Sequence, residues 1–162
     1  MGAQKFLLLK ADIDRELKQL GTLVGECREV VHDLGDEPSP LEVRGTGSIL
    51  HDLYSGIERI LERIATELDG EVPSGRDWHA QLLARMSQAV EKVRPCVLAP
   101  ETADLLRPYL RFRHLFRHSY GTELRWDRCR ELADGVENVW SSFRAEMNDF
   151  RAVLDSLYDG CS

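Results

Sequence analysis

Residues 126–158 read WDRCRELADGVENVWSSFRAEMNDFRAVLDSLY, and the spacing of their apolar side chains decides the fold class. Apolar residues recur every three or four positions, which is the period of one face of an α-helix, whereas a strand would alternate every second residue. The pattern therefore predicts one long helix with a single buried stripe. The stripe consists of Leu132, Val136, Val139, Phe143, Met147, Phe150, Leu154 and Leu157.

The rest of the chain carries the same helical period, and no stretch alternates like a strand. The predicted helices are a long first helix that ends near residues 35–40, then about 41–68, 77–93 and 100–118. Gly- and Pro-containing segments separate them, as expected for short connections. Five helices with short connections predict an all-α, up-and-down bundle that forms a single domain over residues 1–162.

Pro108 interrupts the fourth helical pattern. A proline inside a helix removes a hydrogen bond and crowds the preceding turn, so we expect it to end or kink this helix. The alternative is that the helix begins near Pro108, because proline suits a first turn. In either case Gly121 is expected to close the helix.

Composition is that of a soluble globular protein, with 43% hydrophobic and 30% charged residues. The longest apolar run near the start has four residues, so no membrane span is predicted. The four cysteines lack metal-ligand spacing, which indicates free thiols in a reducing cytoplasm. We expect neither a metal ion nor a cofactor.

The charge is unevenly distributed along the chain. The net charge is −7, yet residues 107–130 hold seven arginines and two acids, whereas residues 131–162 hold seven acids and two arginines. Arginine binds phosphate or carboxylate through two N–H groups at once. The basic segment therefore indicates an anionic partner at one site, or alternatively a solvated face whose arginines pair with nearby acids.

The sequence RFRHLFRHSYG, residues 111–121, lies in this basic segment. Arg111 and His118 are seven positions apart, nearly on one helical face, while Arg113 and His118 are roughly 140° apart on a regular helix. An imidazole can transfer the protons that RNA cleavage requires, and a guanidinium can stabilise the charge on phosphorus. Cleavage of this kind needs the ribose 2′-OH and would select RNA.

This motif resembles the signature of HEPN-domain ribonuclease toxins, in particular the HepT-like group: an arginine, four to six residues, a histidine, one residue and a tyrosine. The stretches HDLYSGIERILERIA (51–65) and PSGRDWHAQLLARM (73–86) are also similar to that group. Four arginine–histidine pairs in the chain have a permitted spacing, and requiring the tyrosine leaves only the pairs that end at His118.

The resemblance implies an all-α homodimer in which the motifs of both subunits line a shared cleft. It implies cleavage of RNA, often tRNA, with Arg113 and His118 as catalytic residues. It also implies a neighbouring MNT-type nucleotidyltransferase antitoxin that transfers AMP from ATP to Tyr120. Relatives often carry asparagine where this chain has His114, which we expect to be a supporting residue or a surface histidine.

Several assignments stay open at this stage. The family pattern favours Arg113 as the catalytic arginine, whereas helical geometry favours Arg111, and both can bind phosphate alongside Arg117. Glu58 is expected to be exposed, the alternative being a pair with a motif arginine inside the bundle. His51 and His79 are expected to be structural. The rivals to a ribonuclease are an inactive HEPN module that binds nucleotide or a nucleotidyltransferase, and a helical adaptor.

Overall fold

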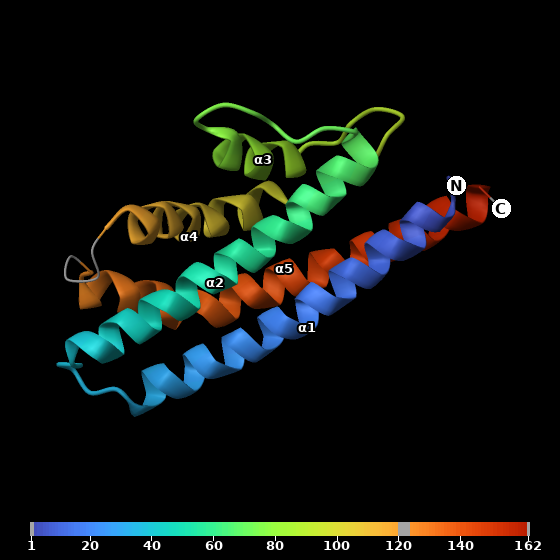
Figure 1. Ribbon diagram of the computed structural model, residues 1–162. Helices are drawn as coiled ribbons and strands as arrows, with labels where there is room; N and C mark the ends of the chain where they lie inside the picture. The colour runs from blue at the N-terminus through green and yellow to red at the C-terminus, as the bar shows by residue number, and fades with distance from the viewer. Residues whose placement is uncertain (1, 120–123, 162) are drawn as a thin grey trace.

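The computed structural model describes residues 2–119 and 124–161, which form a bundle of α-helices (Figure 1). In this part of the chain no strand is present, so the predicted all-α fold is confirmed. The elements are α1 (Gln4–Asp33), α2 (Pro40–Ile64), a short π-helical segment η1 (Ala65–Asp69), α3 (Trp78–Met86), α4 (Pro100–His118) and α5 (Trp126–Cys161).

The two longest helices, α1 and α5, lie side by side and run in opposite directions, so both chain ends lie at one end of the bundle (Figure 1). α2 packs against α1 and α5, and α4 packs against α2 and α5. The short α3 lies across α2 and α4, on the side away from α1. The C-terminal end of α4 therefore lies at the opposite end of the bundle from the termini.

α2 is the central helix of the core because it contacts every other helix. Its start is fixed by Ser39 and Glu42, whose side chains each accept a hydrogen bond from the other's backbone N–H. Full burial of each large aliphatic side chain contributes about 1.5–3 kcal/mol. The predicted stripe is buried throughout: Leu50, Leu53, Ile57, Ile60 and Ile64.

α4 begins at Pro100 and continues through Pro108 to His118. The helix predicted over about 100–118 is therefore confirmed, and Pro108 neither ends nor begins it, while a kink there stays a prediction. Its neighbours in sequence explain why the helix persists: Leu106 and Tyr109 are buried in the bundle, and the Tyr109 hydroxyl donates a 2.6 Å hydrogen bond to the carbonyl of Leu132 in α5. The free energy gained from this tertiary packing offsets the loss of the backbone hydrogen bond that proline cannot make. Gly121 lies outside the described residues.

α3 ends at Met86, seven residues before the predicted end. The carbonyl of Met86 accepts hydrogen bonds from the backbone N–H groups of Val97 and Leu98, so the chain folds back on itself. The cause is Arg94, whose side chain is fully buried and binds Asp69 with N–O distances of 2.6 and 2.9 Å. This ion pair replaces the last predicted turns of helix with a compact loop. Among the described residues, no helix is long and apolar enough to cross a bilayer.

Candidate functional site

Apart from Tyr120, the predicted site residues lie along the second half of α4, where helical geometry separates them into two groups. Arg113 is 8% exposed and lies on the face toward α2. Arg111, His114, Arg117 and His118 are exposed to solvent. Because 100° separates successive residues, Arg113 and His118 lie roughly 140° apart around the helix axis.

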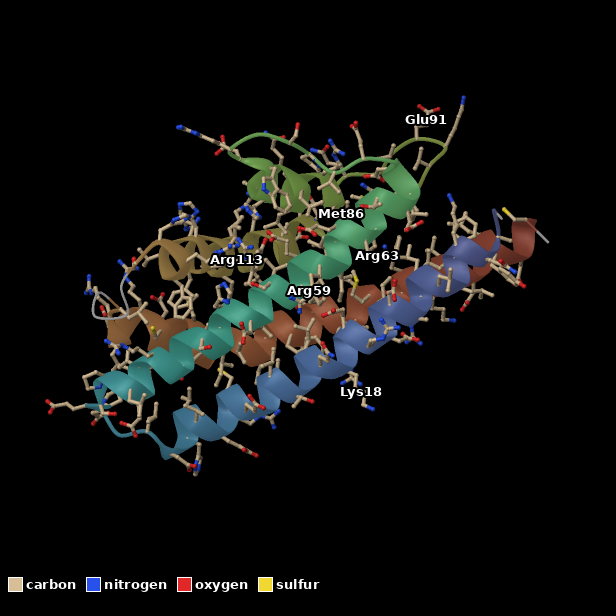
Figure 2. The ribbon with its side chains drawn as sticks, in the orientation of Figure 1. Lys18, Arg59, Arg63, Met86, Glu91 and Arg113 are labelled. Carbon is tan, nitrogen blue, oxygen red and sulfur yellow. The ribbon has the colours of Figure 1, made fainter. Side chains whose placement is uncertain are left out.

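Arg113 reaches across the gap between α4 and α2 (Figure 2). Its Nε donates a 3.2 Å hydrogen bond to Ser55 Oγ, and its Nη2 lies 3.3 Å from Glu58 Oε1. Ser55 and Glu58 are three positions apart on α2, so they present neighbouring oxygens to the same guanidinium. An arginine buried this deeply needs such partners, because an unpaired buried charge is strongly destabilising.

Glu58 is 3% exposed, so the expectation that it is a surface glutamate is wrong. It forms the interior pair with a motif arginine that was the alternative. A signal for this burial exists in the sequence: Glu58 is four positions after Tyr54 and three before Leu61, both fully buried on α2. It therefore continues an apolar stripe as a charged residue, which favours a buried partner.

His79 of α3 extends the same network. Its Nδ1 lies 2.7 Å from Glu58 Oε2, so the two carboxylate oxygens of Glu58 bind different partners. The ring of Trp78 stacks on His79 with 3.7 Å between ring centroids. Residues from α4, α2 and α3 thus form one continuous chain of polar contacts, Arg113–Glu58–His79, which sequence reasoning did not connect.

The surroundings of this network are poorly hydrated and carry negative charge. Burial, followed by the charge of Glu58, raises the pKa of the Tyr54 hydroxyl well above its ordinary range. The same two causes raise the pKa of Glu62, one turn beyond Glu58 on α2. Tyr54 and Glu62 therefore both lie in poorly hydrated surroundings close to the Glu58 carboxyl group.

His118 is the last residue of α4 and lies on its exposed side. The ring of His114 lies 4.5 Å from the ring of His118, as expected for residues one turn apart. The structure thus brings these two imidazoles together and holds Arg113 on another side of the helix within one protomer. Arg111 is two turns from His118 on the same side. Tyr120 lies outside the described residues.

The end of α4 is held against α2 by Phe116. The ring of Phe116 lies 5.1 Å from the ring of His51, which agrees with a structural role for that histidine. Gly47 allows the close approach, since a Cβ atom there would lie 3.1 Å from Phe116 and 3.1 Å from Leu124. The position of His118 therefore depends on the packing of a small residue on α2.

The basic segment contains paired and unpaired arginines. Arg107 binds Asp104 and Arg125 binds Asp127, as expected for a solvated face whose arginines pair with nearby acids. Arg130 likewise binds Asp36. Arg111, Arg117 and Arg128 have no acidic partner among the described residues. Their exposed guanidinium groups can bind an anion.

The chain is similar to a known protein family over the region that holds this site. The family model described as HepT-like protein matches residues 45–154, about two thirds of the chain, and this range includes the whole of α4. A search of curated proteins found no significant match. Among the described residues, no group of three or more His, Cys, Asp or Glu side chains is placed to hold a metal ion.

Proposed function

Because the chain belongs to the HepT-like family, we propose that it is the toxin of a toxin–antitoxin pair and acts as an endoribonuclease in the cytoplasm. The observation that carries this proposal is the placement of the Arg-x4-His-x-Tyr motif. It falls inside the matched region, and its histidine, His118, is exposed at the C-terminal end of α4 together with Arg111 and Arg117 on the same helix.

In the proposed reaction, His118 removes the proton from a ribose 2′-OH, whose oxygen then attacks the adjacent phosphorus. The bond from phosphorus to the 5′-oxygen breaks, and that oxygen receives the proton that His118 took from the 2′-OH. The products are a 2′,3′-cyclic phosphate end and a 5′-hydroxyl end. Arg113 stabilises the extra negative charge that develops on phosphorus. Arg111 and Arg117 bind neighbouring phosphates, and His114 supports His118.

We propose that the active form is a homodimer. Within one protomer Arg113 and His118 face different ways, so a second subunit against α4 would complete the RNA-binding cleft. Leu115 supports this arrangement because it is a large apolar residue, 51% exposed, between His114 and Phe116. Leu115 lies inside the motif, so an interface that buried it would also bring the motif against the second subunit.

The proposed regulation acts on Tyr120. A nucleotidyltransferase antitoxin of the MNT type would transfer AMP from ATP to the phenolic oxygen, with pyrophosphate as the leaving group. The added phosphodiester charge would repel RNA phosphate and attract the exposed arginines. The wild-type protein should then lose cleavage when the partner and ATP are present, whereas Tyr120→Phe should keep it.

The function is tested by purified protein and RNA with His118→Ala, and with His32→Ala as the control. His32 is an exposed histidine in α1, far from α4 in sequence. We expect His118→Ala to lower the cleavage rate by at least about 100-fold, because it removes the general base, and His32→Ala to leave it unchanged. Wild-type products should carry 2′,3′-cyclic phosphate ends.

A second function is favoured by the contacts of Arg113. Its guanidinium already binds Glu58 and Ser55 and lies off the face of His118. The alternative is therefore an inactive HEPN module that binds a nucleotide or a nucleotidyltransferase without cleaving RNA. Equal cleavage by wild type and His118→Ala would indicate a contaminating ribonuclease and favour this alternative.

A further inference from the structure

The contacts that the structure shows for the Arg113 guanidinium involve two of its three nitrogens. Nε binds Ser55 and Nη2 binds Glu58, whereas Nη1 binds no side chain or carbonyl among the described residues. The planar group is therefore fixed on two of its three nitrogens. Its remaining N–H groups have no protein partner in this part of the chain.

Glu58 is itself restrained at both oxygens. Oε1 binds Arg113 and Oε2 binds His79 Nδ1, so the carboxylate cannot rotate without losing a contact. The Trp78 ring covers His79 and limits its movement. The position of the Arg113 guanidinium therefore depends on α3, a helix that carries none of the motif residues.

We propose that Glu58 and His79 are positioning residues for Arg113, holding its guanidinium so that the Nη1 edge binds the phosphate of an RNA substrate. The proposal rests on the ribonuclease function proposed above. An arginine side chain has four rotatable bonds, and fixing it before the substrate arrives removes that entropy cost from the reaction. A buried pair also keeps the guanidinium in poorly hydrated surroundings, where its interaction with the transition state is stronger.

The chemistry of His79 allows a sharp test. Its Nδ1 is the atom that contacts Glu58, and the side-chain amide of asparagine places an N–H group at a similar distance from the backbone. His79→Asn should therefore keep the contact, whereas His79→Leu should remove it while preserving bulk. Glu58→Gln, a second variant, keeps the shape of the side chain and removes its charge.

We expect His79→Leu and Glu58→Gln to lower kcat about 10- to 100-fold, with KM changed less than about threefold, because a displaced arginine weakens binding of the transition state more than of the substrate. His79→Asn should restore kcat to within about threefold of wild type. Circular dichroism and thermal melting check that each variant is folded. A general loss of packing would not be rescued by asparagine, so the rescue separates positioning from a structural role.

A second measurement follows the arginine itself. The Nε–H of Arg113 should exchange slowly with water in wild type and in His79→Asn, and faster in His79→Leu, as read by nuclear magnetic resonance. If cleavage depends on His118 while folded His79→Leu keeps the wild-type kcat, the positioning role is wrong and the ribonuclease stands. If cleavage does not depend on His118, the ribonuclease is wrong and the positioning role is overturned with it.

Discussion

Two arginines of this chain are buried, and their hydrogen bonds distinguish their roles. Arg94 uses every N–H of its guanidinium: Asp69 binds at Nε and Nη2, and backbone carbonyls of residues 85, 88 and 95 accept the rest. A guanidinium satisfied in this way fixes a loop and has no capacity for a ligand. Arg113 keeps Nη1 without a partner among the described residues, which is the pattern of a binding group.

At the same scale, the contact between Glu58 and Arg113 is a feature that the sequence alone does not predict. The motif in α4 is readable because its residues are close in sequence. The partner of Arg113, Glu58, lies 55 positions earlier on another helix. The apolar spacing within one helix does not show which other helix it packs against. Glu58 was therefore expected to be exposed, and its interior pair with a motif arginine was only the alternative.

Glu62 gives a prediction that depends on pH. Burial and the charge of Glu58 raise its pKa in the folded protein above the ordinary value of 4.5. The folded state therefore binds this proton more tightly than the unfolded state, so the free energy of unfolding falls as pH rises from that value through the raised pKa. Glu62→Gln should remove this decrease.

Urea unfolding of Glu62→Gln and wild type at pH 4 and pH 7 measures the effect. The variant should be more stable than wild type at pH 7, and the difference should vanish at pH 4, where both side chains are neutral. A variant that is less stable at pH 7 would mean that ionised Glu62 is favoured in the folded protein. Glu67→Gln, a partly exposed acid in the neighbouring segment, serves as a control.

At the scale of elements, α2 and α5 were predicted with nearly correct bounds because a long apolar period is hard to mistake. The end of α3 was predicted wrongly, because the buried ion pair of Arg94 and Asp69 joins residues 25 positions apart and overrides the local helical pattern. The apolar period predicted α4 over about 100–118 but left open whether Pro108 would end, kink or begin the helix. Packing on both sides of the proline keeps the helix continuous, and packing is not visible in local spacing.

Pro108 provides a test of that explanation. It cannot donate to the carbonyl of Asp104, so α4 lacks one backbone hydrogen bond. Pro108→Ala should restore this bond and increase the free energy of unfolding by about 1–2 kcal/mol, after allowance for the greater freedom of the unfolded chain. Urea titration measures the change, and a decrease in stability would show that the ring itself contributes packing.

At the scale of the whole molecule, the all-α bundle followed from counting helices. The homodimer stays a prediction, because an interface leaves little local signal in the sequence. Leu115 tests the proposed dimer. Leu115→Glu should weaken self-association at least about tenfold, since burial of an interface leucine is replaced by burial of a charge.

Analytical ultracentrifugation at micromolar concentration reads this change. Leu8→Glu is the matched control, because Leu8 is 65% exposed on α1, near the termini. It should associate like wild type. A wild-type protein that sediments as a monomer, or a Leu115→Glu protein that remains dimeric, would rule out an interface across this part of α4.

The shared location of the two chain ends has a practical consequence. His118 closes α4 at the far end of the bundle from both termini (Figure 1). A reporter or affinity tag fused to either terminus would project away from the imidazole, separated from it by nearly the full length of α5. Immobilisation through such a fusion leaves the motif end open to an incoming nucleic acid, so surface-based binding measurements suit this protein in either orientation.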